Sequence, residues 1–203
     1  MKTCCLLLFA LLLPLLLLPL GTAAQVPEED VPALVKRLGG SLITSAGPGA
    51  PIITIDLHGT AVTDADLAVI ATVTTLEALD LRLTGVTDAG IRHLAAATKL
   101  RILNLFRTQM SDVGLASLAG LQQLEVLLIG GTAITDAGSA HLVQMSALRK
   151  VSLFDTRISD AALLPLGAMQ QLDVLLLGRT AVSVDAMRGL QAAIPGLVFT
   201  EES

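Results

Sequence analysis

Hydrophobic and polar positions recur at a fixed interval along this 203-residue chain. One column of the repeat holds threonine in every copy: Thr60, Thr84, Thr108, Thr132, Thr156 and Thr180. A large or branched apolar residue follows two places later, then Thr or Ser, and then aspartate in five of the six copies. Fixed periods between about 20 and 50 residues are typical of stacked repeat architectures. The pattern therefore predicts a solenoid of six repeats over residues 52–195.

Each repeat combines a short strand with a short helix. In residues 76–94, LEALDLRLTGVTDAGIRHL, the alternate residues Leu79 and Leu81 point to one side as in a strand, and Ile91 and Leu94 follow at helical spacing. One such unit cannot bury its apolar face alone, so neighbouring repeats are expected to stack. The expected fold class is an α/β solenoid, with a parallel sheet on the concave side and short helices on the convex side.

Polar columns fit the turns and helix starts of this fold. The threonine column, Thr84 in this repeat, is expected to tie down the turn after the strand through its hydroxyl. Thr87 or Asp88 is expected to cap the helix by accepting hydrogen bonds from its free amides. The aspartate column is 64, 88, 112, 136 and 160, and stacked strands about 4.8 Å apart would also suit a ladder of calcium ions. We favour capping, because Val184 replaces the aspartate in repeat six.

The consensus L-x-x-L-x-L-x-x-T-x-V-T-D-A-x-L-x-x-L resembles the leucine-rich repeat, in the short form common in bacterial secreted proteins and related to F-box and ribonuclease-inhibitor-type repeats. The column that usually holds Asn or Cys in that family holds Thr here. Gly90, Gly114 and Gly138 indicate close packing between coils. The resemblance implies a recognition scaffold, and no cofactor is expected.

Both ends of the array are expected to carry caps. Residues 25–51 form the N-terminal cap, because PEEDVPALVKRLGG places apolar residues at helical spacing up to Gly39, and residues 41–45 can then form a hairpin with the strand that starts at Ile52. Residues 196–203 supply a last strand, with Phe199 in the strand-leucine column. These caps cover the apolar ends of the stack.

Residues 1–24 indicate a cleaved secretory signal peptide. One lysine precedes an apolar run over residues 4–20, and small residues follow up to Ala24. An uncleaved anchor helix is the alternative, although the run is short for a span and contains two prolines. Cleavage after Ala24 predicts no stable membrane span, loss of both cysteines, and a secreted protein or one of the periplasm or cell envelope.

Composition and motifs argue against nucleic-acid binding and catalysis. Removing Lys2 from the 13 basic residues leaves 12 against 18 acidic residues, a net charge of −6 without a basic run, Trp or Tyr. The sequence has no hydrolase motif, phosphate loop or histidine pair at metal spacing. His93 and His141 fall on the convex side, and His58 lies four repeats from Ser152. We therefore expect a protein that is not an enzyme and that binds no metal.

The outward strand positions differ from repeat to repeat, and a binding face is expected there. Its N-terminal half is polar and its C-terminal half is apolar. The candidate binding residues are Asp56, His58, Asp80, Arg82, Ile102, Asn104, Phe106, Val126, Leu128, Phe154, Val174 and Leu176. Two alternatives stay open. The two aspartates and the histidine would suit a metal, although His58 and Arg82 are expected to offset the carboxylates. The apolar side chains would also simply pack against one another.

Two phenylalanines, Phe106 and Phe154, share one outward column with Gly130 between them and Gly178 after them. Strand spacing predicts rings about 10 Å apart. This alternation of large and small residues predicts sockets between aromatic walls that would hold side chains of a partner. If the rings instead fill the space left by the glycines, they extend the core.

The sequence therefore predicts a secreted module that binds a protein or peptide on its concave face. The fold does not fix the partner. The alternatives are an inhibitor or substrate-recognition subunit, which the F-box and ribonuclease-inhibitor resemblance implies, and a structural envelope protein that self-associates.

Overall fold

The computed structural model describes residues 30–46 and 49–200. The expected signal peptide, residues 25–29 of the expected N-terminal cap and residues 201–203 of the expected C-terminal cap lie outside the described residues.

One sheet of eight strands follows the chain in order from β1 to β8. The first pair of strands is antiparallel, and each later pair is parallel with equivalent positions of successive repeats side by side. The strands are β1 (Ser41–Thr44), β2 (Ile52–Asp56), β3 (Ala78–Asp80), β4 (Ile102–Asn104), β5 (Val126–Leu128), β6 (Lys150–Ser152), β7 (Val174–Leu176) and β8 (Val198–Thr200). The predicted parallel sheet is thus confirmed.

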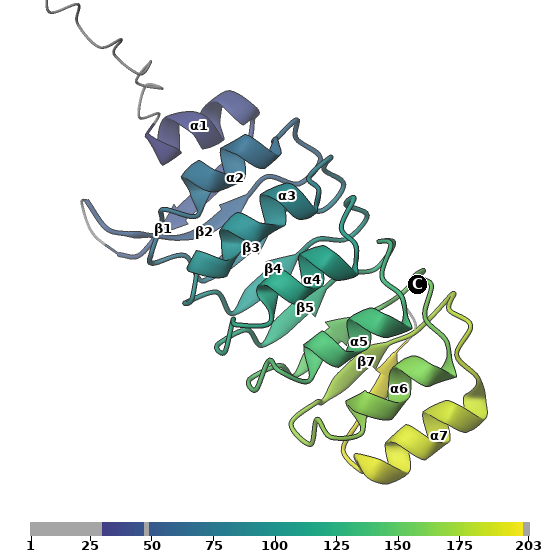
Figure 1. The fold of residues 1–203 in the computed structure, drawn as a ribbon. Coiled ribbons are helices and arrows are strands. Elements are labelled where there is room, and N and C mark those ends of the chain that lie inside the picture. The colour runs from purple at the N-terminus through teal and green to yellow at the C-terminus, as the bar shows by residue number, and fades with distance from the viewer. Residues whose placement is uncertain (1–29, 47–48, 201–203) are drawn as a thin grey trace, which may run out of the picture.

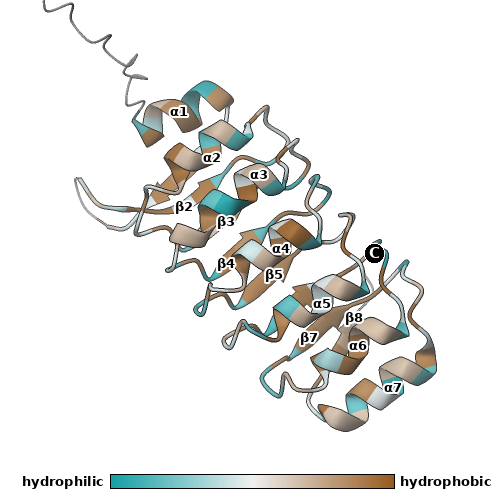
Figure 2. Ribbon diagram, viewed as in Figure 1, coloured by the Kyte–Doolittle hydropathy of each residue, from teal (hydrophilic) through white to brown (hydrophobic). Residues whose placement is uncertain are grey.

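Helices lie side by side along one face of this sheet (Figure 1). They are α1 (Val31–Leu38), α2 (Asp64–Ile70), α3 (Asp88–Ile91) with the 3₁₀ helix η1 (Arg92–Ala96), α4 (Asp112–Leu118), α5 (Asp136–Leu142), α6 (Asp160–Leu166) and α7 (Val184–Ala193). Figure 2 shows hydrophobic residues along the strands and a mixture of hydrophobic and polar residues on the helices. Each helix buries aliphatic residues, such as Leu67 and Ile70 of α2, although Val113 of α4 and Leu164 of α6 are exposed to solvent.

The core is a continuous stack of aliphatic side chains between sheet and helices. In the second repeat Leu79, Leu81, Ile91 and Leu94 are all at most 1% exposed. The other repeats bury the corresponding residues in the same cluster, with two exceptions in the Ile91 column: Ser139 is buried but polar, and Met187 is only partly buried. The core thus consists of the columns that the sequence pattern marks as apolar.

The threonine column ties down the turn after each strand, as the sequence predicts. Each threonine hydroxyl donates to the backbone carbonyl three residues earlier, at 2.5–2.9 Å. The four threonines of the central repeats are buried. Because each bond stays within one repeat, the column stabilises the turn and does not join one repeat to the next.

The residue just before each threonine lies in the left-handed region of backbone conformation, with φ between 54° and 67°. Gly59 and Gly131 take this place in two repeats, and four side-chain-bearing residues take it in the others: Leu83, Arg107, Asp155 and Arg179. This conformation costs a residue with a Cβ atom about 1–2 kcal/mol. The turn therefore holds strain in four of the six repeats.

The expected N-terminal cap is a helix followed by a hairpin. Helix α1 buries Val31, Leu34 and Val35 against the first repeat and is capped at its C-terminus by Gly39, which has φ of 79°. Strand β1 then pairs antiparallel with β2. At the other end β8 pairs with β7 and places Phe199 opposite Leu175, the predicted strand-leucine column.

Candidate functional site

The aspartate column joins neighbouring repeats, which corrects the expectation that each aspartate caps its own helix. The Asp136 carboxylate accepts the backbone N–H of Ser159 at 2.6 Å and the hydroxyl of Ser159 at 2.6 Å. The helix of Asp136 is capped instead by Thr135, whose hydroxyl accepts from the N–H of Ala137. Aspartate therefore acts between repeats, while the preceding Thr or Ser acts within one.

The same pair of bonds recurs at five successive steps, at 2.5–2.9 Å. The pairs are Asp64–Thr87, Asp88–Ser111, Asp112–Thr135, Asp136–Ser159 and Asp160–Ser183. Both carboxylate oxygens are thus engaged by protein donors. Within residues 30–46 and 49–200, no group of three or more His, Cys, Asp or Glu residues could hold a metal ion.

The glycine column follows from this ladder. A Cβ atom at Gly90, Gly114 or Gly138 would overlap the carboxylate of the preceding repeat's aspartate. At Gly114 the backbone N–H also donates to Asp88 at 3.1 Å. The predicted close packing between coils is confirmed, and its cause is the carboxylate that lies against each glycine.

The outward side chains of the strands form the surface that we call the sheet face. It comprises the twelve candidate residues together with Thr54, Ala78, Lys150, Ser152, Gly130 and Gly178. No helix of the described chain covers it (Figure 1). Within residues 30–46 and 49–200, the sheet face therefore lies uncovered by helices along all six repeats.

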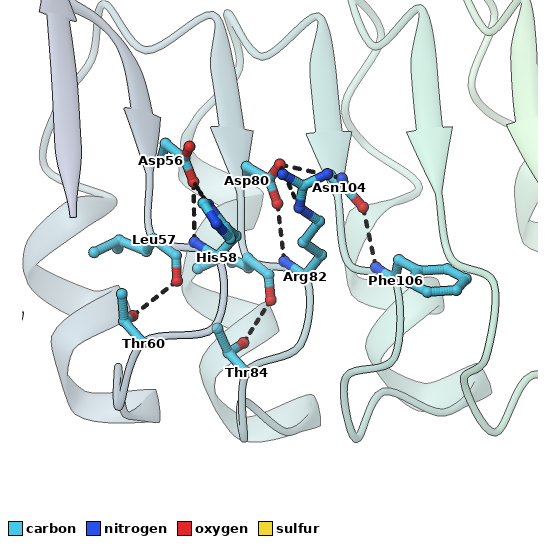
Figure 3. Close-up of polar contacts among 10 residues, drawn as sticks. Asp56, Leu57, His58, Thr60, Asp80, Arg82, Thr84, Asn104 and Phe106 are labelled. Atoms are coloured by element: carbon cyan, nitrogen blue, oxygen red, sulfur yellow. Dashed lines mark hydrogen bonds and ion pairs between the residues drawn. The ribbon is translucent and has the colours of Figure 1, made fainter. Parts of the chain in front are cut away.

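In the polar half of the sheet face, three neighbouring strands end in the same way. Asp56, Asp80 and Asn104 each accept the backbone N–H of the residue two places later, at 3.0–3.1 Å (Figure 3). Asp and Asn side chains commonly stabilise turns by this bond. The amide Nδ2 of Asn104 also donates to Asp80 Oδ2 at 3.2 Å, which joins β3 to β4.

Each carboxylate of this half is paired with the base of its own repeat, as expected. His58 Nδ1 lies 2.8 Å from Asp56 Oδ1, and Arg82 Nε lies 3.4 Å from Asp80 Oδ2. Burial raises the pKa of Asp56, but the hydrogen bonds and charge of His58 and the charge of Arg82 outweigh it and hold the pKa below the ordinary value. Each of the two carboxylates is therefore bound by a basic side chain of the protein itself.

In the apolar C-terminal half of the sheet face, the rings of Phe106 and Phe154 lie over Gly130 and Gly178, so the predicted sockets are not present. The ring centroids of Phe106 and Phe154 lie 6.5 Å apart, closer than strand spacing predicts, with the planes tilted by 36°. A Cβ atom at Gly130 would lie 3.0 Å from Phe106 Cδ2, and one at Gly178 would lie 2.9 Å from Phe154 Cδ2. Both rings therefore fill the space that the glycines leave and are half-buried on the sheet face, because a ring in contact with the sheet exposes less area to water.

The apolar candidates are less exposed than the alternation suggests. Ile102 is 46% exposed, whereas Leu176 is only 5% exposed and so is not available to a partner. Leu176 lies on β7 between β6 and β8. The Phe154 ring also covers Gly178, which follows Leu176 by two residues. Three other candidates are half-buried: Val126, Leu128 and Val174.

Two arginines of the sheet-face rim do not appear among the candidates from sequence. The Arg107 guanidinium lies 5.2 Å from the Phe106 centroid, and that of Arg179 lies 5.8 Å from the Phe154 centroid. Such cation–π contacts are worth about 0.5–1 kcal/mol at exposed sites. The signal was available, because both arginines fall in the column directly after the phenylalanines and glycines.

A second feature that the sequence offered is a column of alternating charge where the strands begin: Glu77, Arg101, Glu125, Arg149 and Asp173. Arg101 donates to both carboxylate oxygens of Glu125, at 3.0 and 3.1 Å. These bonds from Arg101 lower the pKa of Glu125. Most of the column is exposed, so its ion pairs contribute little to stability.

The surface has a hollow on each side of the sheet. On the sheet face Arg82, Asn104, Phe106 and Leu128 line about 190 Å³. A larger hollow of about 480 Å³ lies on the helix side between α6 and α7, where Leu164 is 82% exposed. Its walls are nearly all small or aliphatic, and its one carboxylate, Asp160, is already bound to Ser183.

The candidate catalytic groups do not meet. Ser152 is fully buried on β6, and β3, β4 and β5 separate it from β2, at whose end His58 lies. His93 and His141 lie on η1 and α5, on the helix side.

None of the helices in the described parts of the chain is long and apolar enough to cross a membrane.

A model of the leucine-rich-repeat family matches residues 74–95 and 96–119, the second and third repeats. Among solved structures, an internalin of Listeria monocytogenes aligns with a TM-score of 0.56 and 18% identity, over 86% of this chain and 54% of the internalin. The fold is a leucine-rich-repeat solenoid. The chain thus spans about half the length of that internalin.

A second structure, internalin C2 of Listeria monocytogenes, aligns with a TM-score of 0.54 and 20% identity, over 87% of this chain and 93% of the internalin. The comparison with curated proteins finds no match. At these identities the likeness to the internalins concerns the fold.

Proposed function

We propose that the protein is a non-catalytic module that binds a protein or peptide on its sheet face. The observation that carries this proposal is the contrast between columns. The inward columns repeat nearly unchanged, while the outward columns change from Asp and Asn to Leu and Ser on strands that keep the same register. Stacked repeats gain nothing in stability from such variation, and solenoids of this kind commonly bind partners on an extended face.

The face has the chemistry of a recognition surface and not of a reaction centre. It offers paired charges at Asp56 and Asp80, a tilted aromatic pair and an exposed Ile102. A nucleophile would need a base within hydrogen-bond reach. The buried Ser152 and the distant His58 do not supply that arrangement.

The test compares two lysine substitutions on opposite sides of the sheet. Peptides are selected from a displayed random library on the purified protein, and their affinities are then measured for the parent, for Ile102→Lys and for Leu164→Lys. Lys150 already occupies the column of Ile102, so the fold accommodates lysine there. Leu164 is exposed on α6 and serves as the matched control.

We expect Ile102→Lys to weaken binding at least about tenfold, or about 1.4 kcal/mol, with no change in the unfolding midpoint. Leu164→Lys should bind as the parent does. Loss of binding with Leu164→Lys alone would move the site to the helix-side hollow and refute the proposal. A sizing column run on the same sample separates this function from self-association, which would appear as a stable oligomer that Ile102→Lys dissociates.

We further propose that residues 1–24 direct export and are removed. The proposal rests on the lysine, the apolar run and the small residues that end at Ala24. Mass spectrometry of the exported protein should give an N-terminus at Gln25. A retained Met1 on a membrane-bound protein would show that the segment is an anchor.

A further inference from the structure

The sheet-face hollow holds hydrogen-bond donors that the protein itself does not use. Arg82 directs Nε toward Asp80, and its backbone N–H also donates to that carboxylate, at 3.0 Å. Among the described residues, the two terminal nitrogens of this guanidinium form no hydrogen bond with the protein. Arg82 is 45% exposed, so these nitrogens are accessible to a ligand.

Asn104 adds a further donor whose orientation is fixed. Its Oδ1 accepts the N–H of Phe106 at 3.1 Å, which assigns the oxygen, and its Nδ2 donates to Asp80 at 3.2 Å. One N–H of the amide is left over. Figure 3 shows the Arg82 guanidinium and the Asn104 amide side by side at the Asp80 carboxylate. Asp80 therefore holds both donor groups in place.

The opposite wall of the hollow is apolar. Phe106 and Leu128 complete the lining of the 190 Å³ space. Liquid water occupies about 30 Å³ per molecule, so the hollow holds the volume of roughly six waters. Sites for drug-sized ligands begin at about 300 Å³. The space thus suits one side chain of a few carbon atoms with a polar end.

The charge near the hollow is positive, although the chain as a whole has a net charge of −5. Asp80 and Arg82 offset each other. Arg107, stacked on the Phe106 ring, has no carboxylate within ion-pair distance in the described parts of the chain. A ligand group that accepts hydrogen bonds and carries negative charge is therefore favoured over a neutral one.

We propose that this hollow is an anchor site for an acidic side chain, glutamate or aspartate, of the bound protein or peptide. The carboxylate accepts from the Arg82 guanidinium and the Asn104 amide, while the methylene groups pack on Phe106 and Leu128. This inference rests on the proposed binding function of the sheet face. It adds the chemistry that the partner must present between β3 and β5.

The experiment uses Asn104 as a built-in reporter, because it is the chain's only asparagine. Protein labelled with ¹⁵N-asparagine gives one side-chain amide pair in an NMR spectrum. The probe is N-acetyl-glutamate amide, and the matched neutral probe is N-acetyl-glutamine amide at the same concentration and ionic strength. For a ligand of this size we expect a dissociation constant on the order of 1–10 mM.

The acidic probe should shift the Asn104 amide signals saturably, and the neutral probe should bind at least about tenfold more weakly. Arg82→Gln should abolish the shift, Arg82→Lys should weaken binding severalfold because lysine lacks the planar fork, and Arg92→Gln on η1 should change nothing. An equal response to both probes, no saturable shift, or full binding by Arg82→Gln overturns the proposal.

The two proposals fail in different ways. If the selected peptides bind in a manner sensitive to Ile102→Lys but contain no required acidic residue, the acidic anchor is wrong while the sheet-face function stands. If their binding ignores Ile102→Lys and only the glutamate probe responds, the hollow binds carboxylates but the sheet face is not the docking surface.

Discussion

Replacing Asp136 with alanine tests whether the aspartate column joins one repeat to the next. The substitution removes the acceptor of two hydrogen bonds at 2.6 Å, from the backbone N–H and the hydroxyl of Ser159. Each hydrogen bond to a charged group contributes about 1.5–3 kcal/mol. Asp136 and Ser159 are only partly buried, so water replaces part of that, and we expect a loss of about 2 kcal/mol in the free energy of unfolding.

The partner is identified by a double-mutant cycle with Ser159→Ala. This second substitution removes the hydroxyl donor but keeps the backbone N–H, so in its background Asp136→Ala should cost about 1 kcal/mol less. Contacting pairs show such coupling, whereas distant pairs add within about 0.5 kcal/mol. Asp88→Ala combined with Ser159→Ala is the matched control, because Asp88 bonds to Ser111 and lies three repeats away.

The assay is equilibrium unfolding in urea followed by circular dichroism, with the m-value checked for each variant. An unchanged m-value shows that the variants still unfold as one unit. If Asp136→Ala and Ser159→Ala prove additive, the carboxylate acts on its own helix and the ladder is wrong. A melting temperature that calcium raises in the parent but not in Asp136→Ala would favour a metal instead.

Three further predictions concern the cap helix, its link to α2 and the strained turn. Leu34→Ala should cost about 2–5 kcal/mol in urea unfolding, because Leu34 is fully buried in α1, and a loss below about 0.5 kcal/mol would make α1 a dispensable tail. Asp66→Asn should destabilise the protein at neutral pH: burial raises the pKa of Asp66, but bonds from Thr63 and the charge of Arg37 lower it below its ordinary value. The stability that the carboxylate contributes is fully present above the unfolded-state pKa of about 3.9. It is lost as pH falls through the lower folded-state pKa, so the unfolding free energies of parent and variant should converge below about pH 4. A difference in unfolding free energy that stays constant with pH contradicts this. Leu83→Gly should be about 0.5–1 kcal/mol more stable than Leu83→Ala, the reverse of the usual order, because only glycine relieves φ of 58°, and the usual order there would refute the strain.

The parts of the fold that depend on one repeat were predictable from the sequence. Leu79 and Leu81 alternate and Thr84 bonds to its own repeat, so the pattern within a single repeat suffices to place them. The partner of Asp88 was not predictable in this way. Its carboxylate could reach the amides of its own helix or Ser111 of the next repeat, and only the stacking of the two coils decides between them.

The prediction of sockets beside Phe106 and Phe154 was wrong for a related reason. Strand spacing gives the separation of the backbones that carry Phe106 and Phe154, but the direction of each ring depends on a rotamer and on the space beside it. Gly130 and Gly178 provide that space on the same side of both rings. The two glycines therefore mark where the rings lie, whereas the prediction from sequence treated them as empty sockets.

The structure separates the residues that hold the repeats together from those available for recognition. The aspartate ladder lies at the helix starts, and the threonine bonds and aliphatic stack lie inside the solenoid, away from the sheet face. On that face the same strand position is Asp80 in one repeat, Leu128 two repeats on and the buried Ser152 in the next, yet the parallel register continues unchanged. The chain itself therefore shows that this position accepts both polar and apolar residues in the same fold, although Asp80 and Asn104 also stabilise their turns through hydrogen bonds. It follows that exchanging Asp80 and Asn104 for the residues of later repeats should change what the sheet face binds while leaving the stacking, and with it most of the stability, in place.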